Sequence, residues 1–418
     1  MESFFKVKTP EEVHRILDRF GPAGTERVPI EAALDRVLCE EITAPEDLPL
    51  FPRSSMDGYA VRAKDTFGAA ESLPALLEVI GEIPMGGAPS KELGPGQALR
   101  ISTGGMLPQG ADAVVMVEYC RLMDEKTLEV DRPVSPLENV IQPGDDFRKG
   151  RRILEKGRRL RFQDLGVLAG LGIGEAPVYT RPRIGIISTG DELVDVHETT
   201  APGQVRDVNR YTLSAFCRKL GAEPVPLGRS GDSFHDLRAL IREGLDRTDS
   251  VWISGGSSVG TRDLTLGVLE SFDGFDLLVH GISISPGKPT IIGRVGACPV
   301  LGLPGHVASA MVVAEVFLGR LIRRLSGLRG ASLEGRAHLT AVLSRNIESA
   351  PGREDYVRVK LSKEGGRWVA VPIFGKSALI STLVEAHGLG RVDLHSEGLY
   401  QGDAVRVRLF DDASGGGL

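Results

Sequence analysis

Residues 251–263 read Val-Trp-Ile-Ser-Gly-Gly-Ser-Ser-Val-Gly-Thr-Arg-Asp, an apolar run that stops at two glycines and continues into hydroxyl residues and a basic–acidic pair. The pattern predicts a buried strand followed by a polar loop. Two more apolar runs, at residues 184–192 and 300–306, also end in glycine-bearing turns. Loops at the carboxyl ends of strands in an α/β sheet bind ligands, and glycines let backbone N–H groups approach an anion closely. The three loops together therefore predict one shared anion-binding site.

A regular alternation of strand and helix patterns begins at residue 182. The expected strands are residues 184–188, 224–227, 251–254 and 277–282, and the expected helices are residues 211–220, 234–245, 264–272 and 307–325. Such alternation is typical of a parallel sheet covered by helices. We therefore predict a central α/β domain with a parallel sheet over residues 178–328.

The residues before this domain show two kinds of sequence pattern, one helical and one β-like. Helical spacing of apolar residues predicts helices at residues 10–20 and 27–38, and residues 145–171 are charged and favour helix. The intervening stretch is rich in proline and glycine, with short β-like runs at residues 76–80, 98–102 and 113–118. We therefore predict an inserted β-rich domain, residues 46–141, within a split helical N-terminal segment, residues 1–45 plus 142–177.

Short β patterns return in the last part of the chain. Apolar and basic residues alternate at residues 357–361 and 405–409, as they do in half-buried strands. This predicts a C-terminal β domain over residues 332–412. The whole chain is thus expected to be an α/β multidomain protein.

Composition narrows the functional classes. A formal net charge of −6 argues against nucleic-acid binding, which normally needs a basic face. Four scattered cysteines without a CxxC pair are typical of reduced thiols in a cytoplasmic protein. Charged residues among the first dozen positions leave no signal-peptide core, and prolines and glycines interrupt the longest uncharged run, residues 297–314. We therefore expect a cytoplasmic protein that binds neither nucleic acid nor membrane.

Four carboxylates follow predicted strands of the α/β domain: Asp191, Glu192, Asp232 and Asp263. Carboxylates gathered at one sheet edge suit Mg²⁺ bound to a phosphate, although each one alone equally suits a helix cap. Lys288 lies between glycine and proline residues that hold its backbone rigid, which suits a fixed cation facing an anionic ligand; a solvated loop lysine is the alternative.

Other motifs carry less information. Neither Gly287-Lys288 nor Gly375-Lys376-Ser377 has the spacing of a phosphate-binding P-loop. His306 is interpreted as either a base, a ligand or a structural residue. By residue type alone, Asp57 and Thr103 belong to ordinary turns of the β-rich insert.

Taken in order, the motifs resemble one family, the MoeA-type molybdopterin molybdenumtransferases, which also occur as the E domain of gephyrin. The resemblance covers nearly the whole chain. It is carried by Ser54-Ser-Met-Asp-Gly-Tyr-Ala60, Ile101-Ser-Thr-Gly104, Gly110-Ala-Asp-Ala-Val-Val115, Ser188-Thr-Gly-Asp-Glu-Leu193, Ser254-Gly-Gly256 through Gly260, Pro286-Gly-Lys-Pro289 and Leu303-Pro-Gly305.

The resemblance implies a homodimer in which one subunit's α/β domain and the partner's inserted domain share a site, with contacts to other proteins of molybdenum cofactor biosynthesis. It implies the catalytic residues Asp57, Thr103, Glu192, Asp232, Asp263 and Lys288, of which Glu192, Asp232 and Asp263 hold Mg²⁺. The residues implied to bind the pterin substrate are Ser188, Thr189, Gly190, Ser254, Gly255, Gly256, Ser258, Gly260, Pro286, Gly287, Pro304 and Gly305.

The implied reaction inserts molybdate into adenylylated molybdopterin and releases AMP. The chain departs from the family pattern at Gly305-His-Val-Ala-Ser309, at Ser285 before Pro-Gly-Lys-Pro, and at Ser257 after Ser-Gly-Gly. Because molybdate and tungstate share shape and charge, tungstate insertion stays open. A gephyrin-like scaffold without turnover, and a hydrolase or adenylyltransferase acting on another nucleotide, are the alternatives from other classes.

Overall fold

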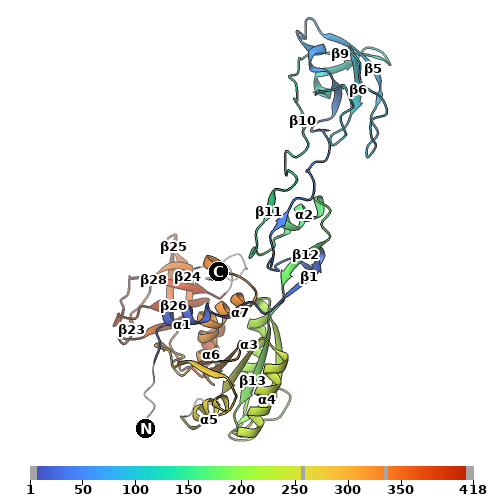
Figure 1. Ribbon diagram of the computed structural model, residues 1–418. Helices are drawn as coiled ribbons and strands as arrows, with labels where there is room; N and C mark the ends of the chain where they lie inside the picture. Colours follow the sequence, from blue (N-terminus) through green and yellow to red (C-terminus); the bar gives the residue numbers. More distant parts are fainter. Residues whose placement is uncertain (1–6, 256–258, 334–337, 411–418) are drawn as a thin grey trace.

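The computed structural model describes residues 7–255, 259–333 and 338–410. Figure 1 shows an elongated chain. A β domain lies at one end, a slender segment follows, and the α/β domain and the C-terminal β domain lie together at the other end.

The α/β domain is built on a six-stranded sheet in the order β16-β13-β17-β21-β20-β18. Its strands are β16 (Glu223–Ser230), β13 (Arg183–Thr189), β17 (Ser250–Gly255), β21 (Cys298–Leu303), β20 (Ile291–Val295) and β18 (Phe275–His280). The first four are parallel, whereas β20 is antiparallel to both neighbours. The predicted strands are confirmed, but the sheet is mixed rather than parallel. Val295 pairs with Cys298 across a two-residue turn, and such a short connection joins only antiparallel strands.

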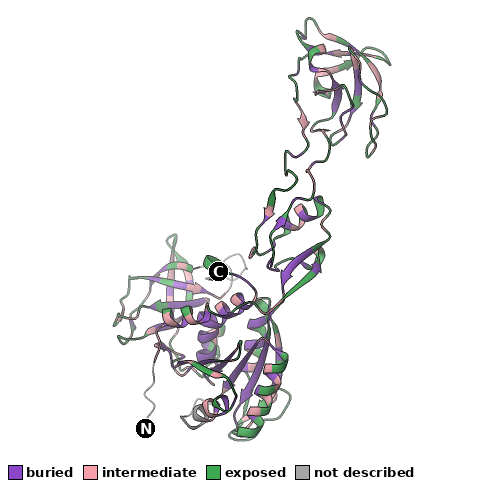
Figure 2. Ribbon diagram, viewed as in Figure 1, coloured by how far each residue is buried: buried purple, intermediate pink, exposed green. Residues whose placement is uncertain are grey.

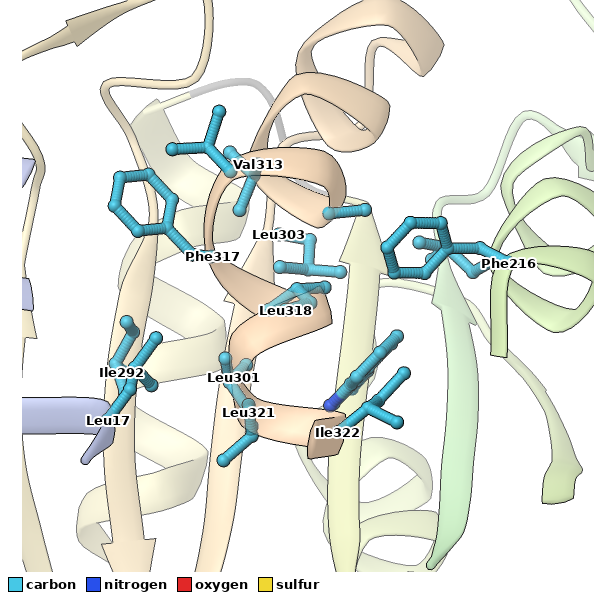
Figure 3. Packing of buried hydrophobic residues seen from close by; sticks show 14 of the residues in the cluster. Leu17, Phe216, Ile292, Leu301, Leu303, Val313, Phe317, Leu318, Leu321 and Ile322 are labelled. Carbon is cyan, nitrogen blue, oxygen red and sulfur yellow. The ribbon is translucent and has the colours of Figure 1, made fainter. Parts of the chain in front are cut away.

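Helices cover both faces of this sheet, as predicted. They are α3 (Asn209–Lys219), α4 (Phe234–Arg247), α5 (Val259–Glu270), and a continuous helix formed by α6 (Val307–Val313), a π-helical turn η4 (Ala314–Leu318) and α7 (Gly319–Leu325). Figure 3 shows the packing of Leu301 and Leu303 of β21 against Leu318 and Leu321 of that continuous helix. The other face packs against α4 and α5. Strand β17 alternates between the two cores, because successive side chains point to opposite faces.

Helix α1 (Pro10–Leu17) confirms the first predicted helix. Thr9 and Glu12 form a capping box at its start. Its Val13 and Leu17 are fully buried in the α/β core, and Asp18 accepts two hydrogen bonds from Arg320 of α7, both at 2.7 Å. The helix therefore packs on the α/β domain rather than within the slender segment.

The slender segment combines short strands with one α-helix, so the helix expected over residues 27–38 is wrong and helix occupies only part of residues 145–171. Strand β1 (Thr25–Pro29) pairs antiparallel with β12 (Glu175–Tyr179), where a helix over residues 27–38 was expected. Pro29 suits this short strand and would interrupt a helix there. The other elements are η1 (Ile30–Ala32), β2 (Ile42–Thr43), β11 (Arg152–Leu154) and α2 (Phe162–Gly170), the one α-helix within residues 145–171.

The inserted domain contains the predicted short strands. Its sheet has the order β7-β4-β6-β5-β9-β8. The strands are β4 (Gly58–Val61), β5 (Ala75–Glu82), β6 (Gln97–Ile101), β7 (Ala113–Met116), β8 (Cys120–Leu122) and β9 (Thr127–Val130), with η2 (Ala63–Thr66) and η3 (Val117–Tyr119) between them. Strands β3 (Arg53–Ser54) and β10 (Val140–Ile141) pair where the chain enters and leaves.

The C-terminal domain is a β-barrel. Strands β24-β25-β22-β28-β26 form a ring, because β24 also pairs with β26. Their bounds are β22 (His338–Leu343), β24 (Glu354–Glu364), β25 (Arg367–Pro372), β26 (Gly388–Val392) and β28 (Ala404–Leu409). The remaining elements are β14 (Leu193–Val194), β15 (Val205–Arg206), β19 (Ile284–Ser285), η5 (Gly330–Leu333), β23 (Ile347–Glu348), α8 (Ser381–Val384) and β27 (Gly398–Leu399).

Each of these domains has its own buried core. Figure 2 shows buried residues concentrated in the α/β sheet and in the inner faces of the two β domains. Across the described ranges, no helix is long and apolar enough to cross a membrane. All four cysteines are free thiols.

Candidate functional site

The strand register brings five loops to one edge of the α/β sheet. Thr189, at the end of β13, pairs with Ser230 of β16 and Gly255 of β17. The row continues through β21 to the start of β20 and the end of β18, where Ile291 pairs with His280. The loops after β13, β16, β17, β18 and β21 therefore open on the same side, which is where α/β sheets bind ligands.

The centre of this edge is tightly packed at Gly255. Gly255 has φ +149°, and a Cβ added there would lie 2.1 Å from the carbonyl oxygen of Thr189. Only glycine, which has no Cβ, lets the backbone come this close to the Thr189 carbonyl. The side chains of Ser188, Thr189 and Ser254 are buried beside it, and the hydroxyls of Ser188 and Thr189 have no hydrogen-bond partner among the described residues. Buried polar groups without partners are costly, so these hydroxyls are suited to a polar ligand.

Asn209 connects two of the loops, and the sequence reasoning missed it. Its Nδ2 donates to the Ser254 hydroxyl at 2.7 Å and to the Gly305 carbonyl at 2.8 Å. Its Oδ1 is buried and has no partner within the described parts of the chain. The available signal was an asparagine at the start of the helix expected from residue 211, a position usually explained as a cap.

Three carboxylates gather at the β13–β16 side of the edge. The Glu192 carboxylate folds over Gly190, since a Cβ on Gly190 would lie 2.7 Å from Glu192 Oε2. Asp191 Oδ1 accepts a hydrogen bond from the Asp232 amide at 3.0 Å. Burial, followed by the charges of Asp191 and Glu192, raises the pKa of Asp232. Two of the three predicted Mg²⁺ ligands, Glu192 and Asp232, thus lie close together.

The third predicted ligand cannot be placed in the same way. Asp263 and Gly260 lie in α5, and the side chain of Asp263 is outside the described atoms. Gly256, Ser257 and Ser258 lie outside the described residues. Within the described chain, no three His, Cys, Asp or Glu side chains form a ready metal site.

Lys288 lies at the same edge but toward the other end of the sheet, in the loop between β18 and β20. The backbone is fixed there, because the Lys288 carbonyl accepts from the amides of Ile282 and Thr290, both at 2.9 Å. Lys288 is exposed and lines a pocket of about 530 Å³ with Ser285 and Pro286. Arg353 of the β-barrel lines the same pocket and pairs with Asp355 at 3.0 Å. The sequence reasoning did not identify Arg353, because it belongs to a different domain.

The β21 loop joins the C-terminal domain. Pro304 is buried, and His306 Nδ1 lies 2.8 Å from the Ser377 hydroxyl. The Ala308 amide donates to the Ser377 carbonyl at 3.0 Å. His306 therefore has a structural partner, and Gly375-Lys376-Ser377 forms a docking loop between β25 and α8.

Asp57 and Thr103 meet each other but not this edge. The Thr103 amide donates to Asp57 Oδ1 at 2.7 Å, and this bond, with one from the Thr103 side chain, lowers the pKa of Asp57. Asp57 is exposed on the inserted domain. Figure 1 shows that domain at the opposite end of the molecule from the α/β sheet. One chain by itself does not unite all the predicted catalytic residues.

Three family models match this chain. The "MoeA N-terminal region (domain I and II)" matches residues 7–172, the "Probable molybdopterin binding domain" residues 185–324, and the "MoeA C-terminal region (domain IV)" residues 340–410. The second match contains most of the loops described above.

Full-length relatives agree with these matches. The molybdopterin molybdenumtransferase of Bacillus subtilis is 32% identical, with 99% of this chain and 96% of the relative covered. That of Haemophilus influenzae is 33% identical over 94% of this chain and 96% of the relative. A molybdopterin biosynthesis MoeA protein from Pyrococcus horikoshii, 36% identical, superimposes with a TM-score of 0.84 over 97% of this chain and all of the solved one. The chain belongs to the MoeA family of molybdopterin molybdenumtransferases, and the predicted family and its role in molybdenum cofactor biosynthesis are confirmed.

Proposed function

We propose that this chain inserts molybdate into adenylylated molybdopterin with Mg²⁺ present, releasing AMP. The observation that carries the proposal is the shared sheet edge, where buried unpartnered hydroxyls lie beside a group of carboxylates. An oxygen attacks one phosphorus of the phosphoanhydride, the P–O bond to the other phosphate breaks, and AMP leaves. Molybdate forms two Mo–S bonds to the dithiolene, and one of its oxygens leaves with the two thiol protons as water.

The centre of the edge suits the pterin part of the substrate. Ser188 and Thr189 offer hydroxyls, and Asn209 offers a carbonyl oxygen, each buried and without a protein partner among the described atoms. A planar ring with amide and amine groups supplies matching donors and acceptors. Gly190 and Gly255 keep the backbone close to the ligand.

The carboxylates suit Mg²⁺. Partial burial, and then the negative charges of Asp191 and Glu192, raise the pKa of Asp232, and a divalent cation would relieve the repulsion among these carboxylates. Glu192 and Asp232, together with Asp263, would hold the ion. When bound, Mg²⁺ offsets charge on the phosphate oxygens of the substrate.

Lys288 and Arg353 suit the oxyanion. Both line one pocket, and a guanidinium and an ammonium attract a tetrahedral dianion. Ser285 stands where a Lys or Gln often precedes Pro-Gly-Lys-Pro in the family, and Arg353 supplies positive charge from the barrel side. Tungstate fits the same charges.

A second copy completes the site in this proposal. Asp57 and Thr103 lie at the far end of the same chain, so a homodimer with crossed inserted domains brings them to the partner's sheet edge. We assign the reaction to the cytoplasm, because free cysteines are typical of a reducing compartment.

One assay tests the activity. Adenylylated molybdopterin is incubated with the chain and Mg²⁺, with molybdate, tungstate or neither, and AMP is measured. We expect AMP release that depends on the oxyanion and stops with a chelator. Consumption of ATP with free molybdopterin would instead identify an adenylyltransferase. Absence of AMP release in all arms would favour a gephyrin-like scaffold without turnover.

A further inference from the structure

The C-terminal barrel meets two different loops at the edge of the α/β sheet. At the first contact, both residues of β19 pair with residues of β24. This contact adjoins the pocket lined by Lys288 and Arg353, here named the oxyanion pocket. At the second contact, His306 of the β21 loop meets Ser377 of the docking loop, residues 375–377. Two separate contacts fix an orientation that either one alone leaves free to rotate.

The His306 side of the second contact is anchored in the α/β domain. The Gly305 carbonyl, one residue earlier, accepts from Asn209 Nδ2 at 2.8 Å. The His306 carbonyl accepts from the Ala310 amide at 2.9 Å, at the start of α6. The imidazole itself is exposed, and its Nδ1 lies 2.8 Å from the Ser377 hydroxyl. The backbone at His306 is therefore held by its own domain while the side chain reaches the barrel.

The Ser377 side of the contact is held by the barrel. Arg358 of β24 is buried, and its Nη2 donates to the Gly375 carbonyl at 2.8 Å. Gly375 also packs closely against α8, since a Cβ there would lie 2.8 Å from Thr382 Cγ2. The Ser377 carbonyl accepts from the Ala308 amide at 3.0 Å. The docking loop thus presents both a hydroxyl and a carbonyl to the first turn of α6.

The geometry of the oxyanion pocket depends on this docking. Lys288 belongs to the α/β domain and Arg353 directly precedes β24 of the barrel, so the orientation of the barrel sets the separation of their charges. Tyr356 and Leu389 of the barrel pack in the α/β core and keep the domains together, but apolar packing is non-directional. A hydrogen bond is directional, so the His306 contact specifies the orientation.

We propose that His306 is a positioning residue for the oxyanion pocket. Its bond to Ser377 fixes the barrel on the sheet edge and thereby sets the distance between Lys288 and Arg353. This role rests on the proposed function, because the ligand of that pocket is taken to be molybdate. His306 then serves binding of the oxyanion, and neither binding of the pterin nor attack on phosphorus.

Kinetics of the full chain test this role. AMP release is measured over a range of molybdate concentrations with Mg²⁺ and saturating adenylylated molybdopterin. We expect His306→Ala to raise the KM for molybdate about three- to tenfold, the effect of losing one hydrogen bond, and to change kcat by less than about twofold. The KM for adenylylated molybdopterin should stay the same. His306 is exposed and the barrel keeps its apolar contacts, so the variant should fold.

Ser377→Ala tests the same bond from the barrel side, so the result does not depend on one variant. We expect a similar rise in the KM for molybdate, and no further rise in the double variant, because both changes remove one shared interaction. The matched control is Ser362→Ala, which removes a hydroxyl near the other end of β24 that donates to Glu364. It should leave both KM values unchanged.

His306→Asn tests whether the hydrogen bond itself matters. An asparagine places a polar atom at the same δ position as His306 Nδ1, so we expect a KM for molybdate within about twofold of that of the unmodified chain. Hydrogen exchange of residues 305–313, followed by mass spectrometry, reports docking without any activity. The Ala308 amide should exchange faster in His306→Ala and at the normal rate in His306→Asn.

The two measurements separate the two proposals. If no protein releases AMP, including the unmodified chain, the proposed function fails, and hydrogen exchange still decides whether His306 fixes the barrel. A normal KM for molybdate in His306→Ala, with an active unmodified chain, contradicts the positioning role. Unchanged exchange at Ala308 in His306→Ala contradicts it as well.

Discussion

Two aspartates of the predicted site, Asp232 and Asp57, are both exposed, but their pKa values are shifted in opposite directions. Asp232 lies at the α/β sheet edge, where partial burial and two neighbouring carboxylates raise its pKa. Asp57 lies on the exposed face of the inserted domain, where hydrogen bonds from Thr103 lower its pKa. A cation would relieve the repulsion at Asp232, whereas Asp57 already accepts a hydrogen bond from Thr103 of the same domain.

The difference teaches how the two halves of the site arise. Asp232, Glu192 and Asn209 come from three separate segments of the α/β domain that the strand register brings to one edge. Asp57 and Thr103 are 46 residues apart and meet because β4 pairs with β6, so they need only their own domain. The sheet edge thus requires the whole α/β fold, whereas the Asp57–Thr103 pair is formed by the inserted sheet alone and would be presented by a second subunit in the proposed dimer.

The largest expected effect is on turnover at the sheet edge. We expect Asp232→Asn to lower the rate of AMP release by about 10²-fold or more, because it removes a charge that serves the metal and the phosphate. The matched control is Asp246→Asn, an exposed aspartate near the end of α4. Near-normal rates in Asp232→Asn would contradict the assignment, and so would an equal loss in the control.

Mixing two inactive variants tests the shared site directly. Asp57→Asn and Asp232→Asn homodimers, unfolded together and refolded, form half of the dimers as mixed pairs if exchange is random. Each mixed pair has one intact site, so we expect recovery of about a quarter of normal activity. AMP release after mixing that is no higher than the mean of the two parents indicates that both residues act within one chain.

Glycine substitutions sharpen the contrast in packing. Gly255→Ala places a Cβ 2.1 Å from a backbone oxygen at φ +149°, whereas Gly104, next to Thr103, has φ +84° and open space around it. We expect Gly104→Ala to cost about 1–2 kcal/mol for its backbone conformation alone. Gly255→Ala must also move backbone, so its denaturant midpoint, followed by Trp252 fluorescence, should fall further. Equal midpoints would show that the edge is not tightly packed.

Asn209→Ala tests how much substrate binding depends on the positions of the loops at Ser254 and Gly305, because it changes no charge. It removes hydrogen bonds to Ser254 and Gly305, and two such bonds correspond to about a tenfold or larger loss of substrate affinity. We expect a higher KM with a smaller change in kcat, measured by AMP release. A normal KM would remove Asn209 from the binding site.

The smallest effect is on the pH dependence of stability. The raised pKa of Asp232 means that its contribution is present at low pH and is lost as pH rises through the folded-state value, so Asp232→Asn raises the thermal midpoint at pH 7 without Mg²⁺. The lowered pKa of Asp57 has the opposite sign: its contribution is present at pH 7 and is lost in acid, so Asp57→Asn lowers the midpoint of the inserted domain. Shifts of the same sign would contradict the two environments.

Much of this organisation was predictable from local pattern. Apolar runs ending in glycine located β13, β17 and β21, since burial and turn chemistry are local properties. The expected helix at residues 27–38 was wrong, because pairing of β1 with β12 outweighs a weak helical periodicity. The antiparallel β20 was also missed, although the two residues between β20 and β21 are too few for the crossover that parallel strands need.

The site residues also divide into those that local sequence pattern predicted and those that it did not. Glu192 and Asp232 were predicted because they follow strands, and Lys288 because prolines and glycine frame it. Asn209 and Arg353 were not, since their significance depends on what lies beside them. Whether Asp57 belongs to the same site remains a prediction that the mixing experiment addresses.

The sequence by itself determined the strands, the glycine loops and the types of side chain available for anions and metal, because these depend on neighbours along the chain. Only the tertiary structure decided which loops share an edge, that Asp232 lies near Asp191 and Glu192, and that Lys288 and Arg353 line one pocket. The physical reason is that register and domain docking bring distant residues together, and charge and burial act through space rather than along the chain.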